Sequence, residues 1–339
     1  MDPSNPDPPR YDFKLLRAGR FKLDGGSMFG LIPRVVWARA VGDQVDGKGR
    51  IPVQHNCLLL TAASGGGHAF KRVVIETGTG NKLDQKSREI FDLEQRWLGD
   101  ALAEAGVSPD DIDAVLVSHL HFDHAGGLTR LCESGERPDW TGPASGMAGS
   151  RPDHGVRLTF PRAPIYVQAR EWRDALQNTS VMTRTYFTDH LGPLRDRVRL
   201  LESPPPFSPG IIPLRDQLPA APASLRLTPI LDDAGKDTGI RTLLVPGHTW
   251  GQQAILFTDR LERTIVFTPD VLPTAWHVGQ AYSLGYDVEP YTSSVSRRWF
   301  LSEAADHNWV LVLDHEPGNP LRSVKRNPRD WFELVPVES

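Results

Sequence analysis

Short runs of aliphatic residues that end in turn residues are the dominant pattern along the chain. In the first half they cover residues 21–24, 51–60, 72–76, 114–117 and 165–167. In the second half they cover residues 225–230, 241–245, 253–257, 264–267 and 310–313. Short aliphatic runs bounded by glycine, proline or small polar residues are typical of strands. After the glycine pair at 25–26, residues 28–33 are expected to form a loop and an apolar return.

Helical spacing is confined to a few segments. Large apolar residues recur at roughly helical spacing over 86–105, and Gly106 follows where a helix often ends. Ser108 and Pro109 precede two aspartates, which predicts a short helical turn. Residues 292–305 fit another helix. Strands alternating with helices predict an α/β or α+β protein in which strands are in the majority.

The chain contains 30 glycines and 29 prolines, which separate the predicted strands and helices. Residues 135–164 are rich in glycine, proline and serine and are expected to form a long loop, and residues 203–222 a surface insertion. The proline- and aspartate-rich residues 1–14 are expected to form a flexible N-terminal arm. The rest, residues 15–339, is expected to be a single catalytic domain, because the candidate ligands described below come from both halves of the chain.

Composition narrows the functional classes. With 39% hydrophobic and 24% charged residues, the chain of 339 residues has the composition of a globular protein with a large core. No apolar run is long enough for a membrane helix, and the N-terminus lacks a signal-peptide pattern, so a cytoplasmic protein is expected. The net charge of −4 gives no general attraction to nucleic acid or a membrane. Two cysteines cannot form a disulfide framework.

The strongest chemical signal follows the run at 114–117. His119, His121, Asp123 and His124 fall within six residues and precede the glycine pair at 126–127. In an extended segment His119 and His121 point to the same side, and the following turn can bring the other two to a nearby point. Imidazole and carboxylate are the ligands that suit zinc or a similar divalent ion. The motif therefore predicts a metal site.

This motif resembles the His-X-His-X-Asp-His signature of the metallo-β-lactamase superfamily of hydrolases. Three later motifs fit the same family in the family's order: Pro246-Gly247-His248-Thr249-Trp250-Gly251, Thr268-Pro269-Asp270 and Leu313-Asp314-His315. Upstream, Glu76 precedes Thr77-Gly78 where the family usually has aspartate. The resemblance covers roughly residues 20–320 and implies an αββα sandwich, with two mixed sheets packed face to face and helices outside.

The resemblance also implies a ligand set and a reaction. His119, His121 and His248 would hold one divalent ion, Asp123, His124 and His315 a second, and Asp270 would bridge the two. Zn²⁺ is the favoured metal, with Mn, Fe or Co as alternatives. A bridging hydroxide on such a dinuclear site would attack an ester-type substrate directly, with Asp123 or Asp270 relaying a proton to the leaving group.

Asp270 favours particular branches of the family. Lactonases, phosphotriesterases and thioesterases carry aspartate at this position, whereas many true β-lactamases carry cysteine or serine. A small lactone of the acyl-homoserine type is the favoured substrate, with an organophosphate triester or a thioester as alternatives. An iron-dependent sulfur dioxygenase that uses the same ligands is the alternative from another class. Pro273 stands where many acyl-homoserine lactonases have tyrosine, and Tyr186, Tyr282 or Tyr286 could replace that tyrosine.

Four further residues are candidates for contact with a small-molecule substrate. Met28 and Phe29 resemble the apolar loop beside the metals in the lactonases, with ordinary core packing as the alternative. Trp250 could narrow the pocket or simply pack, and His277 lies seven residues after Asp270. No nucleic-acid or membrane partner is expected, and a homodimer is an open possibility.

Overall fold

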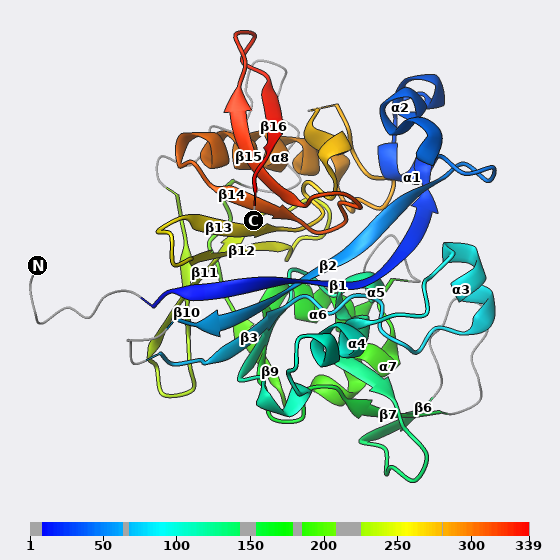
Figure 1. Cartoon of the computed structure of the whole chain (residues 1–339), viewed down its shortest axis with the longest axis vertical. Coiled ribbons are helices and arrows are strands. Elements are labelled where there is room, and N and C mark those ends of the chain that lie inside the picture. Colours follow the sequence, from blue (N-terminus) through cyan, green and yellow to red (C-terminus); the bar gives the residue numbers. More distant parts are fainter. Residues whose placement is uncertain are drawn as a thin grey trace, which may run out of the picture.

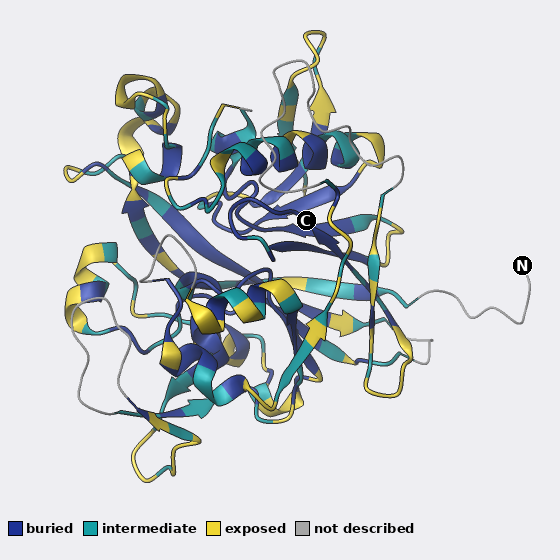
Figure 2. Cartoon of the chain, turned by 180° about the vertical axis from the view of Figure 1, so that it is seen from behind, coloured by how far each residue is buried: buried dark blue, intermediate teal, exposed yellow. Residues whose placement is uncertain are grey.

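The computed structural model describes residues 9–63, 68–142, 154–178, 185–207, 225–279 and 281–338. Within these residues two large mixed sheets lie face to face, and helices cover their outer faces (Figure 1). The first half of the chain builds one sheet and the second half builds the other. Figure 2 shows mostly buried strands in the middle and exposed outer faces on the helices. The predicted αββα sandwich is therefore confirmed.

The first sheet has six strands, ordered β1-β2-β3-β4-β8-β9. Strands β1 to β3 pair antiparallel, and β3, β4, β8 and β9 pair parallel. The strands are β1 (Tyr11–Asp24), β2 (Arg50–Ala62), β3 (Arg72–Ile75), β4 (Ala114–Leu116), β8 (Ile165–Gln168) and β9 (Val198–Leu201).

The second sheet has seven strands in chain order from β10 to β16, antiparallel except for the β13–β14 pair. They are β10 (Thr228–Leu231), β11 (Asp237–Leu244), β12 (Gln253–Thr258), β13 (Thr264–Thr268), β14 (Val310–Leu313), β15 (Leu321–Arg326) and β16 (Phe332–Pro336). A third, small sheet is formed by β5 (Thr129–Leu131), β7 (His154–Leu158) and β6 (Trp140–Gly142).

Helices close both outer faces. The longer ones are α2 (Arg34–Val41), α3 (Gln85–Phe91), α4 (Leu98–Glu104), α6 (Ala169–Gln177) and α8 (Pro290–Asp306). The short ones are α1 (Gly25–Phe29), α5 (Phe122–Ala125) and α7 (Thr188–Leu191), with single 3-10 turns at Gly42–Gln44, Pro109–Asp111, Gly126–Leu128, Gly192–Leu194 and Ala275–Val278. None of the helices in the described residues is long and apolar enough to cross a membrane.

Three apolar clusters correspond to the layers. One cluster fills the space between the sheets, with Leu58 and Ile75 from the first sheet and Ile255 and Phe267 from the second among its members. A second lies between α4 and the outer face of the first sheet, and a third lies between α8 and the outer face of the second. Burial of these alternating strand residues on both faces is the main stabilising contribution, at roughly 25 cal/mol per Å² of apolar surface.

Four local expectations were wrong. Residues 25–29 form helix α1 rather than a loop, because the Asp24 carboxylate caps it by accepting a hydrogen bond from the Ser27 N–H at 2.7 Å. The helical run over 86–105 is two helices, separated after Asp92, which ends α3 with a left-handed φ of 48°. The loop expected over 135–164 contains β6 and β7, which pair with each other.

The N-terminal arm is also shorter than expected. Residues 11–14 belong to β1 and pair with β2, where Tyr11 lies opposite Ala62. Residues 1–8 lie outside the described residues, as do residues 143–153 of the expected loop and 208–222 of the expected surface insertion. The strand expected at 21–24 is the end of the longer β1, and the other strands of the sequence analysis are present with shifts of a few residues at their ends.

Two buried amides join the sheets where the predicted ligands lie. The Asn56 side chain on β2 donates to the carbonyls of Leu313 and Glu316, both at 2.9 Å, on either side of His315. The Gln253 side chain on β12 donates to the carbonyl of Val117 at 2.8 Å, just before the His119 motif. These bonds fix the position of one sheet edge against the other.

We predict that Asn56→Ala destabilises the metal-free protein by about 2–3 kcal/mol, because the buried Leu313 carbonyl loses the Asn56 donor and the Glu316 carbonyl keeps the longer hydrogen bond from Arg17 at 3.3 Å. The free energy of unfolding in urea would measure this. Gln85→Ala is the matched control, since the Gln85 amide is bonded only to the exposed Glu89 side chain, and a change within about 0.5 kcal/mol is expected there. Equal midpoints for the two variants would contradict the role of the amide.

Candidate metal centre

The first motif is held in place by close packing of its glycines. After β4 the chain turns through His119 and His121 into the short helix α5. Thr77 binds the end of this turn, since both its N–H and its hydroxyl donate to the His124 carbonyl, at 3.1 and 2.6 Å. A Cβ atom at Gly126 would lie 2.1 Å from the Thr79 carbonyl oxygen. Glycine is therefore required here for the close approach of the two loops.

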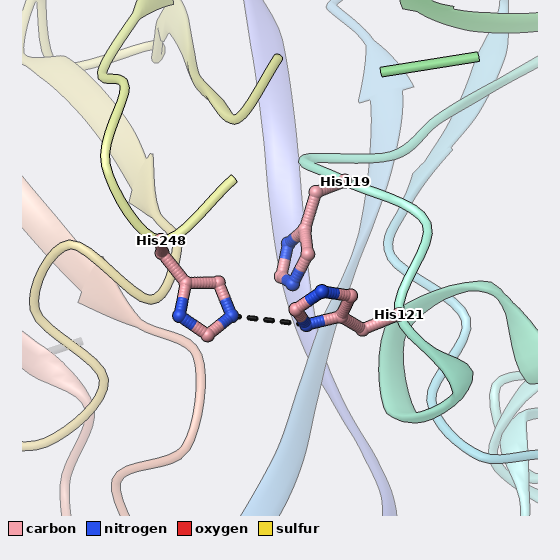
Figure 3. A group of neighbouring side chains, drawn as sticks. All are labelled: His119, His121 and His248. Carbon is pink, nitrogen blue, oxygen red and sulfur yellow. Dashed lines mark hydrogen bonds between the residues drawn. The ribbon is translucent and has the colours of Figure 1, made fainter. Parts of the chain in front are cut away.

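Three histidines form the first group of candidate ligands. His119 and His121 come from the loop after β4, and His248 comes from the turn between β11 and β12 (Figure 3). Their ligand atoms lie within 4.8 Å of one another. His248 Nε2 is 3.0 Å from His121 Nδ1, and all three side chains are buried.

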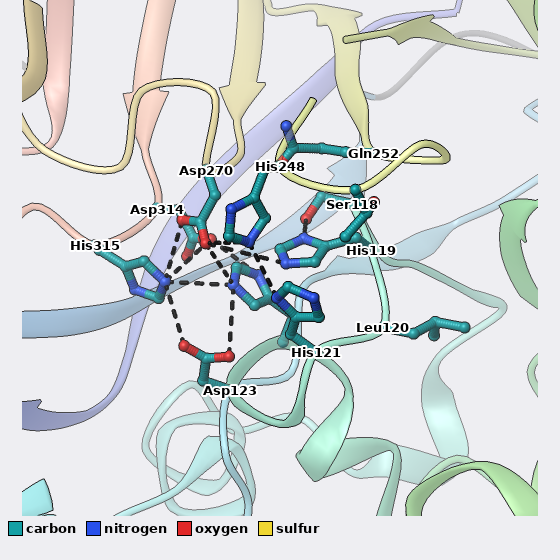
Figure 4. Close-up of polar contacts among 12 residues, drawn as sticks. Ser118, His119, Leu120, His121, Asp123, His248, Gln252, Asp270, Asp314 and His315 are labelled. Carbon is teal, nitrogen blue, oxygen red and sulfur yellow. Dashed lines mark hydrogen bonds and ion pairs between the residues drawn. The ribbon is translucent and has the colours of Figure 1, made fainter. Parts of the chain in front are cut away.

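A second group lies beside the first, and Asp270 contacts both (Figure 4). It contains His124, Asp270, Asp314 and His315. Asp270 Oδ2 is 3.0 Å from His248 Nε2 and 3.6 Å from His124 Nε2, while its Oδ1 is 3.4 Å from His315 Nε2. This placement, directly after β13, is the one a bridging ligand requires.

Asp123 completes the surroundings of the second group. Its two carboxylate oxygens lie 3.8 Å from His124 Nε2 and 3.7 Å from His315 Nε2. The structure thus brings together every residue predicted as a ligand: His119, His121, Asp123, His124, His248, Asp270 and His315. Their coordination of metal and the proton-relay role of Asp123 and Asp270 stay predictions.

Most of these histidines have a partner on the ring nitrogen that faces away from the centre. His119 Nδ1 lies 3.0 Å from Ser118 Oγ, and His248 Nδ1 lies 2.9 Å from the buried Asp287 carboxylate. His315 Nδ1 contacts the Gln54 carbonyl at 3.1 Å. Such outer partners fix the orientation and the tautomer of a metal-binding imidazole.

His124 has two buried carboxylates on its outer side. Its Nδ1 lies 3.0 Å from Asp314 and 3.3 Å from Glu76. Glu76, with a left-handed φ of 66°, also accepts a hydrogen bond from the Ser118 N–H. The contacts of His124 with Asp314 and Glu76 were not predicted. The sequence analysis noted that glutamate replaces the usual aspartate before Thr77, but it gave no indication that this glutamate faces His124.

The charges of the centre are strongly coupled. Burial opposes the positive charge of His248, but Asp270 and Asp287 outweigh it and raise the pKa of His248 to about 10. Burial likewise opposes charge on His124, whose pKa is nevertheless raised by Asp314 and Asp123. The pKa of His119 is lowered by burial and by neighbouring imidazoles. Without metal, protons on some imidazoles therefore balance the buried carboxylates.

The side chains fit divalent cations. His119 Nε2 and Asp270 Oδ1 are buried without a hydrogen-bond partner. His124 Nε2 and His315 Nε2 face each other at 3.3 Å, as His121 and His248 do in the other group. Converging nitrogen lone pairs and carboxylate oxygens, shielded from water, are the donor set that borderline divalent ions prefer.

The predicted substrate residues are mainly packing residues in this structure. Met28 and Phe29 are buried, and the Phe29 ring stacks between Trp37 and His277 at centroid distances of 5.2 and 4.8 Å. His277 Nε2 lies 2.8 Å from the Met28 carbonyl, and burial lowers the pKa of His277 to about 3. These contacts favour core packing. The Trp250 ring is half-buried under the Arg170 guanidinium, and its role at a pocket stays a prediction.

Comparison with known proteins agrees with the fold. The sequence model of the metallo-beta-lactamase superfamily matches residues 50–315. The chain therefore belongs to this superfamily of metal-binding proteins. This membership supports the interpretation that the protein is a hydrolytic enzyme. The matched region contains all the candidate ligands.

Solved structures share this fold at low sequence identity. A probable metal-dependent hydrolase from Staphylococcus aureus is 21% identical, with a TM-score of 0.67 over 98% of this chain and 100% of that chain. The dizinc quorum-quenching lactonase AidC, in complex with a product, is 17% identical, with a TM-score of 0.65 over 98% and 99%. An N-acyl homoserine lactone hydrolase with product at its metal centre is 17% identical, with a TM-score of 0.57 over 91% and 94%.

We predict that metal binding to the metal-free protein at about pH 8 releases at least one proton per chain. The pKa of about 10 keeps His248 protonated in the absence of metal, the raised pKa values of His124 and His315 act in the same direction, and a ligand imidazole must be neutral. Apparent affinity should therefore rise with pH up to about 10. Calorimetry in buffers of different ionisation enthalpy measures the release, and an observed enthalpy independent of the buffer would contradict it.

Proposed function

We propose that this protein is a metal-dependent hydrolase with a dinuclear centre that cleaves a small ester-type substrate. The observation that carries the proposal is the position of Asp270, whose carboxylate contacts His248 of one ligand group and both His124 and His315 of the other. A single carboxylate between two adjoining groups of nitrogen donors is suited to two metal ions held side by side.

The residues divide the work as follows. His119, His121 and His248 would hold one ion, and Asp123, His124 and His315 the other, with Asp270 shared. We propose Zn²⁺ as the native metal, because the donors are imidazole and carboxylate without thiolate. When bound, such ions activate water and stabilise negative charge that develops on the substrate.

We propose Asp123 as the group that transfers the proton to the leaving group. Its carboxylate is buried at the centre, and burial raises its pKa, although the neighbouring His124 and His315 oppose this shift. A carboxyl group with a raised pKa can hold a proton and deliver it to a leaving alcohol near neutral pH. With bound metal ions to activate water and Asp123 to carry the proton, the chain would need no nucleophile of its own.

A lactone of the acyl-homoserine type is the substrate we propose. Support comes from the aspartate at position 270 and from the fold shared with AidC and with the N-acyl homoserine lactone hydrolase. Pro273 removes the tyrosine common in such lactonases, so substrate binding must use other groups. Phosphotriesters and thioesters remain the competing ester classes, and iron-dependent sulfur oxidation is the competing redox reaction.

We predict that protein purified with zinc retains about two metal ions per chain and hydrolyses acyl-homoserine lactones faster than the other ester classes. A panel of acyl-homoserine lactones, an aryl phosphotriester, a thioester and a chromogenic β-lactam tests this by comparing kcat/KM values. Iron content with oxygen consumption on a glutathione persulfide would favour the redox alternative. Fewer than one tightly held metal per chain would contradict the dinuclear hydrolase itself.

We predict that Asp123→Asn lowers kcat on the best substrate by about 10²-fold or more, because proton transfer and the second ligand group are both affected. His119→Ala should lower metal content and activity together. His307→Ala is the control, since this histidine is half-exposed, stacks on Trp309 and belongs to neither ligand group. Full turnover by Asp123→Asn would rule out the mechanism.

A further inference from the structure

A buried glutamate outside the ligand set connects the two loops of the three-histidine group. Glu171 lies in the first turn of α6 and is fully buried. An acidic residue at this position is favoured by the helix dipole alone. Its carboxylate, however, is hydrogen-bonded to residues of the loops that carry the metal ligands.

Each oxygen of the Glu171 carboxylate serves a different loop. Oε1 accepts a hydrogen bond from the N–H of Leu120, the residue between His119 and His121, at 3.0 Å. Oε2 accepts a hydrogen bond from the hydroxyl of Thr249, the residue after His248, at 2.6 Å. One carboxylate therefore sets the distance between the two loops that supply all three histidines.

Tyr186 adds a third contact on the same carboxylate. Its hydroxyl donates to Glu171 Oε1 at 3.1 Å, and its ring lies 5.3 Å from the His121 ring. The tyrosine thus supports His121 from the outer side while it is itself held by Glu171. Burial raises the pKa of Glu171, and the three donors oppose this shift while giving the carboxylate one fixed orientation.

The backbone of the His248 turn approaches Glu171 closely at Gly251. A Cβ atom at Gly251, the last residue of the His248 turn, would lie 2.4 Å from both the Cβ and the backbone nitrogen of Glu171. The glycine of that motif is therefore explained by the approach of α6. Among the described residues, the hydrogen bonds of the Glu171 side chain go to the His119–His121 loop, the His248 turn and Tyr186.

We propose that Glu171 is a positioning residue for the metal ion of the three-histidine group, acting through Leu120 and Thr249. This inference rests on the proposed dinuclear function. We expect Glu171 to affect only this one of the two metal ions. The histidines of the other group have different partners: His124 contacts Glu76 and Asp314, and His315 contacts the Gln54 carbonyl. Loss of the carboxylate should therefore weaken one metal and leave the other nearly unchanged.

The test measures both metal affinities with Co²⁺ as the probe, by competition against a chromogenic chelator. His121→Ala identifies which of the two dissociation constants belongs to the three-histidine group. Glu171→Gln and Thr249→Val, which keep the side-chain shapes, should each raise that constant by about 10- to 100-fold and change the other by less than about threefold. The double variant should be little worse than either single variant, because both break the same connection.

Asp259→Asn is the matched control, since it alters another buried carboxylate that binds Arg263 and its own turn. Thermal unfolding of the metal-free variants separates stability from affinity. Unchanged constants in Glu171→Gln and Thr249→Val, or an equal shift of both constants, would overturn the positioning role. Absence of tight Co²⁺ binding by the wild-type protein would overturn the proposed function and this inference together.

Discussion

Burial of many ionisable groups at one point is the constraint on which this structure depends. Five imidazoles and several carboxylates meet at the edge where the two sheets join, and almost all are shielded from water. Imidazole nitrogens face one another at 3.0 and 3.3 Å, a distance at which they need a proton or a cation between them. Removing these groups from water costs free energy. The surrounding structure, which includes the glycines of the first motif, Asn56 and Asp287, offsets this cost and holds the groups in place.

Local patterns predicted an α/β or α+β protein and a metal site, and the resemblance to the metallo-β-lactamase superfamily implied the sandwich and the full ligand set. Aliphatic runs located most of the central strands to within a few residues but missed the first ten residues of β1 and all of β5, β6, β7, β9, β15 and β16. The dense His119–His124 motif indicated metal chemistry without any knowledge of the fold. Errors occurred where a single local interaction changed the outcome. The Asp24 cap turned a glycine pair into a helix start, and the left-handed Asp92 divided one helical pattern into two. Neither effect changes the hydrophobic periodicity on which the prediction rested.

The residues that orient the ligands could not be predicted in this way. Asp314, Asp287 and Glu171 are single carboxylates in ordinary segments, and each acquires its role from a contact with a residue distant in sequence, such as the 51 positions between Leu120 and Glu171. The predicted substrate loop left two interpretations open. Met28 and Phe29 resemble a family loop, and the stacking of Phe29 between Trp37 and His277 favours the alternative of core packing, while substrate contact stays a prediction. Which side chains line a substrate pocket depends on such packing.

The division of the ligands between the halves of the chain has a consequence for assembly. Each ligand group takes histidines from the first sheet's loops and completes itself with residues from the second sheet, so neither half contains a full binding site. Metal can then be captured only by the joined sandwich, and its binding energy adds to the free energy that holds the two sheets together. The availability of metal would thus affect the stability of the packing between the two sheets. A chelator would destabilise the protein specifically at the edge where the two sheets join.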